Sequence, residues 1–356
     1  GAGVGAGAGL DSAAVSLSAL HDKLAPAFDI FADVVLNANF PPEELERLRA
    51  IALSGLRQEK NRPNAMALRV LPQLLYGAGH PYAQPLTGTG TEAAVGALTS
   101  ADLAAYRDTW FKPNHATLIV AGDTTLAELQ PLVERLFGRW QPGDVPERQV
   151  GPAAGQPGKV LYIVDRPGAD QSVIFAGQVM PPKANPDEFA IQAMNDVLGG
   201  QVSARLNMNL REDKHWSYGA YSSLKDARGE RPFFAYAPVQ TDKTAEALVE
   251  LRGELTAIAG KRPPAAAELD RIKTSQVLAL PGRWETAEAV VGALAESVRF
   301  GLPDDYWQTY ATRLREVSLA DVTRAAREYL QPERQVFVVV GDRARIEPSL
   351  AKLGFG

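Results

Sequence analysis

Residues 317–342 read VSLADVTRAAREYLQPERQVFVVVGD, and residues 98–123 read LTSADLAAYRDTWFKPNHATLIVAGD. The two stretches align without a gap at an offset of 219 residues, so that Pro332 matches Pro113 and Asp342 matches Asp123. An internal match of this length indicates that the chain contains two copies of one structural unit.

Each copy predicts a capped helix followed by a buried strand. Thr99 and Ser318 are N-cap candidates, and each is followed three residues later by an aspartate, which is the pattern of a capping box. The proline of each copy ends the helix, because proline cannot continue the backbone hydrogen-bond ladder. The β-branched, apolar runs 117–120 and 336–340 then suit buried strands.

A weaker second match, between helices that open near Pro41 and Pro263, supports the duplication. Between the copies, residues 141–157 contain several prolines and glycines and no apolar period, which is typical of a linker. We therefore predict a first domain over residues 1–140, a linker over 141–157 and a second domain over 158–356.

The pattern predicts an α+β fold of two homologous domains, each a mostly antiparallel sheet with helices packed on one face. The first domain matches the second only from its middle onward, so we expect it to be truncated at its N-terminus. It is predicted to contain strands within 1–9 and 11–19, a strand over 116–121, and helices over 23–37, 41–60, 64–76, 99–110 and 125–138. The second is predicted to contain strands over 160–164, 172–176, 217–225, 232–239 and 335–340, with helices over 186–198, 201–212, 242–259, 265–280, 284–299, 304–314 and 318–330.

Composition excludes several classes of function. The 356 residues are 46% hydrophobic and carry a net charge of −5, which is typical of a globular chain. The sequence contains no block of basic residues, so nucleic acid is not an expected partner. It contains no cysteine, which excludes disulfides and thiolate metal sites. No apolar run reaches the length of about 18–20 residues that a membrane-spanning helix needs.

Two adjoining stretches identify a family. Residues 198–206, LGGQVSARL, and 210–218, LREDKHWSY, resemble the second-domain pattern LGG-x-x-SRL-x-x-x-LRE-x-x-G-x-x-Y of the insulinase/pitrilysin zinc metallopeptidases. His215 stands where that family usually has glycine, and Ala204 stands where serine is common. Residues 75–89 contain LYG, HPY and GT in an order that resembles the first-domain pattern, so the resemblance covers nearly the whole chain.

The resemblance implies a zinc site built from an H-x-x-E-H helix and a glutamate on a later helix. The four histidines are not spaced in this way; they are His21, His80, His115 and His215. On the helix predicted over 41–60, the position of the later glutamate falls near Gly55, and Glu46 and Glu59 lie elsewhere. The chain therefore resembles the inactive, processing-peptidase-like subunits of the family. It is expected to bind no metal or cofactor, with zinc in a catalytic partner.

The family's enzymes close two such double domains like a clamshell around a short unfolded peptide. The resemblance implies that Arg211 and Tyr218 reach the partner's site, where a guanidinium binds a peptide carbonyl and a phenol stabilises a developing oxyanion. From the residues alone, Arg211 also fits an exposed helix end and Tyr218 a core position in a strand. His80 is interpreted as a turn residue, and His215 as structural or at a cavity wall.

Three hypotheses follow for function. The first is the non-catalytic, substrate-binding half of a zinc metalloendopeptidase, with an H-x-x-E-H partner chain or domain and, in isolation, homodimer formation. The second is a structural or assembly protein of the same fold. The third is a fragment of an active peptidase whose zinc motif lies upstream of Gly1. The Arg211/Tyr218 pair favours the first. The composition and the resemblance favour a bacterial protein, located in the periplasm rather than the cytoplasm.

Overall fold

The computed structural model describes residues 1–154 and 158–355, so that 155–157 of the predicted linker lie outside the described residues. The described part of that linker, 141–154, contains neither helix nor strand. Contacts divide the chain into two compact units, which comprise 1–55, 91–149 and 281–302 in the first, and 56–90, 150–280 and 303–356 in the second. Each unit gathers segments from both halves of the sequence. The domain boundaries that follow the repeat stay a prediction.

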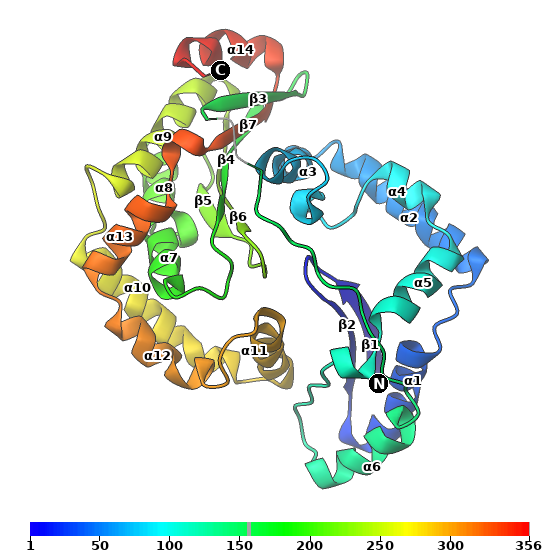
Figure 1. Cartoon of the computed structure of the whole chain (residues 1–356). Helices are drawn as coiled ribbons and strands as arrows, with labels where there is room; N and C mark the ends of the chain where they lie inside the picture. The colour runs from blue at the N-terminus through cyan, green and yellow to red at the C-terminus, as the bar shows by residue number, and fades with distance from the viewer. Residues whose placement is uncertain (155–157, 356) are drawn as a thin grey trace. The chain divides into compact units, whose positions relative to one another are not determined.

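The second unit is built on a five-stranded sheet with the order β3-β7-β4-β6-β5 (Figure 1). Its strands are β3 (Val160–Asp165), β4 (Gln171–Met180), β5 (Tyr221–Leu224), β6 (Arg231–Gln240) and β7 (Val336–Gly341). Among the strands of the described ranges, only β3 and β7 pair in parallel, which confirms the predicted mostly antiparallel sheet. The β-branched run of β7 is buried along its whole length, as expected for a strand with neighbours on both sides.

Helices of the second half of the sequence pack on one face of this sheet. The helix α9 (Thr244–Ala259) contacts β4 and β6, and the helices α13 and α14 pack against α9. The helices α10 and α12 contact each other, and α7 lies against α13. The bounds are α7 (Glu188–Asn195), α10 (Ala266–Ala279), α12 (Tyr306–Glu316), α13 (Leu319–Tyr329) and α14 (Arg343–Leu350).

The opposite face of the same sheet is covered by α3 (Pro63–Tyr76), a helix from the first half of the sequence (Figure 1). Leu71 and Leu75 are fully buried against alternate residues of β4 and β7, among them Val173 and Val338. Side chains alternate between the two faces of a strand, so the intervening residues of β4 face α9. The sequence patterns did not predict that this second face is covered.

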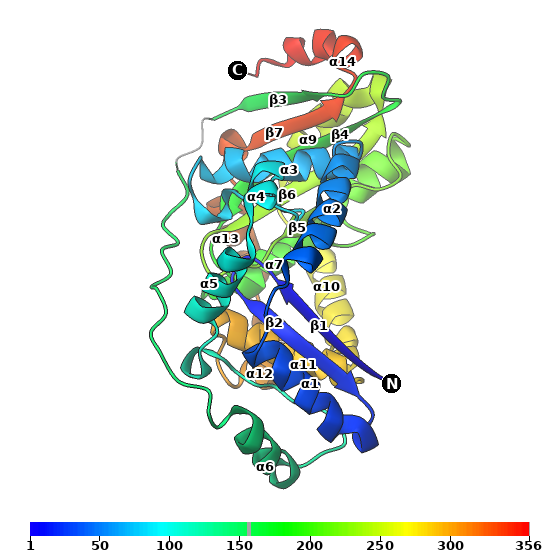
Figure 2. The same ribbon diagram turned by 90° about the vertical axis from the view of Figure 1, so that its right-hand side faces the viewer.

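The first unit contains a two-stranded antiparallel sheet of β1 (Ala2–Ala8) and β2 (Ala13–Ala19), with α1 against it (Figure 2). These strands confirm the prediction for the glycine-rich opening. Phe28, Phe31 and Val35 of α1 form a core with side chains of β2 and α6, including Leu17 and Phe137. The helices assigned wholly or mostly to this unit are α1 (Leu24–Leu36), α2 (Pro42–Glu59), α4 (Glu92–Ala97), α5 (Ser100–Trp110), α6 (Leu126–Phe137) and α11 (Ala287–Phe300).

Both copies of the repeat begin with the predicted capping box. The Thr99 hydroxyl accepts a hydrogen bond from the Asp102 amide at 3.2 Å, and the Asp102 carboxylate accepts one from the Thr99 amide at 2.8 Å. Ser318 and Asp321 make the same exchange at 3.1 and 2.9 Å. The bonds from Thr99 and Ser318 lower the pKa values of Asp102 and Asp321. The repeat therefore reflects the same local structure in both halves.

The strand predicted over 116–121 is wrong. This segment has no regular structure, and Leu118 and Val120 are 47% and 40% exposed. Its repeat counterpart β7 is a strand because it lies between β3 and β4. Among the described residues before 141, no strands correspond to β3 and β4. Residues 116–121 therefore have no neighbouring strand to pair with. Apolar, β-branched sequence becomes a strand only where a neighbouring backbone supplies hydrogen bonds.

Candidate functional site

The site candidate is the loop-rich segment that leads from α7 to β5, and its first turn depends on two glycines. α7 ends at Asn195 and continues into a π-helical turn over Asp196–Gly200, so the helix predicted over 186–198 ends earlier than expected. A Cβ atom at Gly199 would lie 2.4 Å from the backbone nitrogen of Ser222 in β5. A Cβ atom at Gly200 would lie 2.3 Å from Oδ1 of Asp196. Gly199 therefore excludes a side chain, whereas a side chain at Gly200 would displace the Asp196 carboxylate.

The carboxylate of Asp196 is buried under this turn, with 6% of the residue exposed. Gln192 donates a hydrogen bond to Oδ1 at 3.3 Å, and the Gln276 amide donates to Oδ2. Burial among neutral groups raises the pKa of Asp196 to about 6, although these hydrogen bonds oppose the effect. Nothing in the sequence distinguishes this aspartate from those on the surface, because its burial depends on α10.

Two polar side chains fasten the next part of the segment. Arg205 donates to both carboxylate oxygens of Glu268, at 2.8 and 2.6 Å, and to the Pro263 carbonyl at 2.9 Å. Asn207 is fully buried, donates to the Val202 carbonyl at 2.7 Å and accepts from the Ala220 amide at 3.3 Å. These bonds fix both ends of the stretch that carries Arg211 and Tyr218, so Arg205 has a structural role.

Arg211 lies in a second π-helical turn, Met208–Asp213, which follows a single α-helical turn over Arg205–Asn207. The helix predicted over 201–212 is therefore divided. The Arg211 side chain is 43% exposed, and its Nε atom lies 3.4 Å from Oε1 of the neighbouring Glu212. π-helical turns in proteins are frequently found at functional sites.

The turn ends at His215, which has a positive φ of 58°. The Trp216 amide donates to the Leu210 carbonyl at 3.0 Å, across this left-handed residue. His215 Nδ1 lies 3.0 Å from the Arg211 carbonyl oxygen. A residue with positive φ after a helix is usually glycine, which accounts physically for the glycine of the family pattern at this position.

Tyr218 is 87% exposed, so the interpretation that it packs in a core is wrong. The backbone is anchored before it by a bond from the Gln240 amide to the Trp216 carbonyl at 3.1 Å, and after it by Ala220 on Asn207. No hydrogen bond joins the side chains of Arg211 and Tyr218 among the residues that the structure describes. The structure thus places both in one short exposed segment, with neither side chain buried.

The side chains weighed as zinc ligands do not fit a zinc site. Glu59 accepts hydrogen bonds from Arg69 at 2.8 Å and from Thr89 at 3.0 Å, and Glu46 pairs with Arg49 at 3.0 Å. Within residues 1–154 and 158–355, no three histidine, aspartate or glutamate side chains converge on a point where they could hold a metal. Gly55 thus stands at the position of the expected glutamate, and the carboxylates of Glu46 and Glu59 on the same helix are already engaged.

His80 has the role of a turn residue. Its Nδ1 atom accepts a hydrogen bond from the Tyr82 amide at 3.0 Å, which caps a short 3-10 turn over Pro81–Ala83. Its Nε2 atom lies 2.9 Å from the Gly151 carbonyl, and its ring stacks on Tyr76 with 4.7 Å between centroids. With both nitrogens engaged, His80 serves the structure of the second unit.

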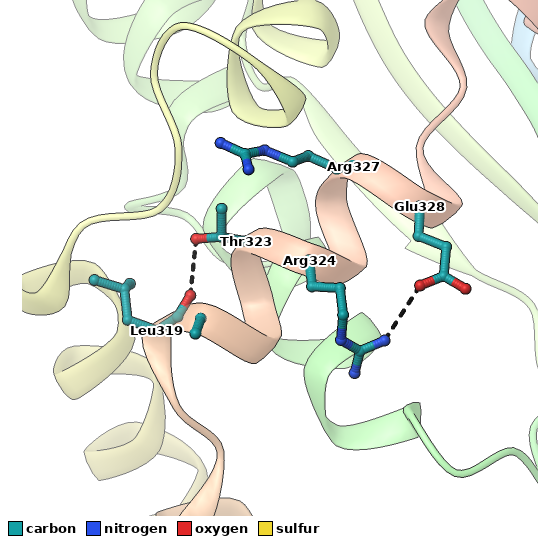
Figure 3. Close-up of a pocket in the computed structure, with 6 residues that line it drawn as sticks. Leu319, Thr323, Arg324, Arg327 and Glu328 are labelled. Carbon is teal, nitrogen blue, oxygen red and sulfur yellow. Dashed lines mark hydrogen bonds and ion pairs between the residues drawn. The ribbon is translucent and has the colours of Figure 1, made fainter.

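A groove of about 540 Å³ runs along α13 (Figure 3). All of its lining residues belong to that helix, and they are Leu319, Ala320, Thr323, Arg324, Arg327 and Glu328. Arg324 already binds the Asp187 carboxylate at 2.6 and 2.8 Å. This pairing and the Tyr329 hydroxyl lower the pKa of Asp187 to about 2. The groove is a helix surface with a satisfied ion pair, and we do not place the site there.

In the part of the chain that the structure describes, no helix is both long and apolar enough to cross a membrane.

Among known proteins, an uncharacterized zinc protease of Mycobacterium leprae is 26% identical over 245 residues, which are 68% of this chain and 54% of that protein. The chain thus spans about half the length of the curated relatives it matches first.

Solved structures share the fold. The peptidase M16 inactive domain of Pseudomonas fluorescens superposes with a TM-score of 0.88 at 24% identity, over 96% of this chain and 80% of that one. The first half of the periplasmic protease PqqL of Escherichia coli superposes with a TM-score of 0.71 at 17% identity, over 98% and 79%. The family model described as the peptidase M16 inactive domain matches residues 97–276, which include the whole glycine, arginine and tyrosine motif. The chain belongs to this family of inactive peptidase M16 domains.

Proposed function

We propose that this chain is the non-catalytic, substrate-binding half of a zinc metalloendopeptidase that degrades short unfolded peptides. The zinc and the H-x-x-E-H motif are supplied by a partner chain or domain. The observation that carries the proposal is the 87% exposure of Tyr218 on a backbone anchored at Trp216 and Ala220. A large aromatic side chain held out from a fixed loop is suited to contact a ligand rather than to stabilise the fold.

Arg211 and Tyr218 supply complementary donors in this proposal. The Arg211 guanidinium, whose one ion-pair partner among the described residues is exposed Glu212, binds a carbonyl of the peptide. The Tyr218 hydroxyl, which has no hydrogen bond among the described residues, donates to the oxyanion that develops at the scissile bond. Exposed Val202 and Met208, at 61% and 42%, lie in the same segment and offer contact to apolar side chains.

The substrate is proposed to be unfolded because the segment leads into a sheet edge. β5 begins three residues after Tyr218 and pairs only with β6 among the described strands. Its other edge presents backbone groups to which an extended peptide can add as a strand. A folded protein offers few backbone groups for such pairing, whereas a short unfolded peptide offers many.

The catalytic partner follows from two observations together. Relatives of this chain are called zinc proteases, and in α2 the carboxylates of Glu46 and Glu59 are already engaged by Arg49 and Arg69. We therefore assign the zinc to a partner that contains H-x-x-E-H, whether as a separate chain or as another part of a longer polypeptide.

Steady-state peptidase kinetics test the proposal, with the fluorescein-labelled oxidised B chain of insulin as an unstructured substrate. The chain is assayed alone and mixed with H-x-x-E-H proteins from the same source, and its zinc content is measured by elemental analysis. We expect no cleavage by the chain alone and cleavage on mixing. In the mixture, Tyr218→Phe should lower kcat by about 100-fold, as expected for loss of one oxyanion donor. Arg211→Ala should mainly raise KM.

Tyr106→Phe and Arg47→Ala are matched controls, because both residues are exposed and lie outside the segment. Stoichiometric zinc or cleavage by the chain alone would contradict the assignment of a non-catalytic half. If mixing produces cleavage that Tyr218→Phe and Arg211→Ala do not alter, the chain acts as a structural subunit. An H-x-x-E-H motif encoded just before Gly1 would identify the chain as part of an active peptidase.

We also propose a periplasmic location in a bacterium. The support is the fold shared with the first half of a protease described as periplasmic. Fractionation of the source cells, followed by detection with an antibody against this chain, tests it, and recovery in the cytoplasmic fraction would refute it.

A further inference from the structure

His215 occupies a backbone position that most side chains disfavour. Its φ of 58° is left-handed, and there a Cβ atom approaches the following carbonyl oxygen. Glycine would adopt this conformation at no steric cost. A histidine at the end of the Met208–Asp213 turn therefore needs a compensating interaction.

The structure shows that interaction. His215 Nδ1 lies 3.0 Å from the Arg211 carbonyl oxygen, and because a carbonyl only accepts, the ring nitrogen must donate. The Leu210 carbonyl is satisfied by the Trp216 amide at 3.0 Å. Carbonyls at the end of a helix lack partners within the helix. Here the two consecutive carbonyls of Leu210 and Arg211 are bound by Trp216 and by the left-handed residue His215.

Neighbouring side chains leave this bond in place. The Lys214 ammonium lies 3.4 Å from the Glu250 carboxylate and 5.4 Å from the centre of the Trp216 ring, so its contacts are with these two side chains. Beyond His215, the Trp216 carbonyl accepts from the Gln240 amide of β6 at 3.1 Å. The backbone between Arg211 and Tyr218 is thus fixed on both sides of His215.

We infer that His215 is a positioning residue: its hydrogen bond to the Arg211 carbonyl fixes the turn that sets where Arg211 stands relative to Tyr218. The functional part of this inference rests on the proposed function of that pair. A histidine that merely tolerates the left-handed position would be replaced by glycine without loss. A histidine that fixes the turn would not.

Three substitutions separate these accounts. His215→Gly keeps the left-handed conformation and loses the hydrogen bond to the Arg211 carbonyl. His215→Asn keeps both, because asparagine adopts positive φ and its side-chain amide donates. His215→Ala loses both. Binding of the labelled insulin B chain to the full chain is followed by fluorescence anisotropy. We expect affinity to fall about fivefold for His215→Gly, more for His215→Ala, and to stay within about twofold for His215→Asn. Equal or tighter binding by His215→Gly would overturn the inference.

Hydrogen–deuterium exchange of a proteolytic peptide covering 210–218 provides a readout independent of binding. His215→Gly should speed exchange of the Trp216 amide about fivefold, and His215→Asn should not. Unchanged exchange would overturn the inference whatever the affinities are. Arg211→Ala and Tyr218→Phe are titrated in parallel. If neither weakens binding, the proposed function fails and the exchange result alone decides the structural role of His215. Circular dichroism confirms that each variant is folded.

Discussion

A Cβ atom placed on Gly177 would lie 2.9 Å from Cδ1 of Leu71, so these two residues mark a direct contact between β4 and α3. Leu71 lies within residues 1–140, the predicted first domain, and Gly177 within residues 158–356, the predicted second domain. Leu71 is fully buried, and Leu75 lies 3.3 Å from the same Cβ position, so neither leucine has free space in which to move. The sheet, whose strands all lie after residue 158, is therefore covered by a helix from residues 63–76.

Gly177→Val is expected to destabilise the protein because it overfills this contact. Forcing extra methyl groups into a packed core costs about 1–3 kcal/mol of unfolding free energy. Urea denaturation followed by circular dichroism measures the change. Gly3→Val is the matched control, since Gly3 is also a strand glycine but has no atom within 4 Å of its Cβ position. Equal stabilities for the two variants would contradict the packing described here.

Gly199→Ala is expected to be at least as damaging. Its Cβ would lie 2.4 Å from the backbone nitrogen of Ser222, and a backbone atom cannot rotate away as a side chain can. We expect a loss of about 3 kcal/mol in unfolding free energy. Gly253→Ala in α9 should instead gain about 0.5–1 kcal/mol, because its Cβ position is open and alanine favours a helix. Chemical denaturation of both variants tests the opposite signs.

Glu59→Ala tests whether this glutamate is structural. Its side chain and that of Arg69 are 13% and 16% exposed, and the substitution leaves the Arg69 guanidinium without its carboxylate. The expected loss is about 2 kcal/mol, below that of a fully buried pair. Glu46→Ala, whose side chain is 68% exposed, should change stability by less than about 0.5 kcal/mol. A drop in bound zinc with Glu59→Ala, at unchanged stability, would instead identify a ligand.

Asp196 predicts a pH dependence of stability with a defined sign. Burial raises its pKa from 3.8 to about 6, so the folded state binds this proton more tightly than the unfolded chain does. Its contribution to stability therefore falls as pH rises through the interval from 3.8 to about 6, and the full penalty is present above that interval.

Asp196→Asn keeps the side chain neutral at every pH. Relative to the unsubstituted protein, this variant should gain about 2–3 kcal/mol in unfolding free energy between about pH 4 and about pH 8. Urea titrations across this range measure the difference. Asparagine has one acceptor oxygen for the two glutamine donors. At low pH the variant is therefore expected to have a lower unfolding free energy than the unsubstituted protein. Parallel pH profiles for the two proteins would show that Asp196 is not the buried carboxylate described here.

The candidate site illustrates how far sequence reasoning reaches. The sequence motif of residues 198–218 predicts the segment that contains Arg211 and Tyr218. Its glycines, Gly199 and Gly200, lie where a Cβ atom would approach Ser222 and Asp196 too closely. The exposure of Tyr218 did not follow from the sequence, because an aromatic residue before a strand is compatible with either a core or a surface. The backbone on either side of it is held by Gln240 of β6, which bonds to Trp216, and by Asn207, which bonds to Ala220.

The sequence by itself determined the elements whose causes are local. The caps at Thr99 and Ser318 bond to the residue three positions later and begin the helix. Pro113 and Pro332 end it within their own turn. These local signals therefore specify the same helix in both copies of the repeat. Only the tertiary structure decided which of the two repeated apolar runs became a strand. 336–341 lies between β3 and β4, whereas 116–121 pairs with no described strand. The physical reason is that strand pairing, like the packing of α3 on β4, depends on neighbours far apart in the chain, which no local pattern encodes.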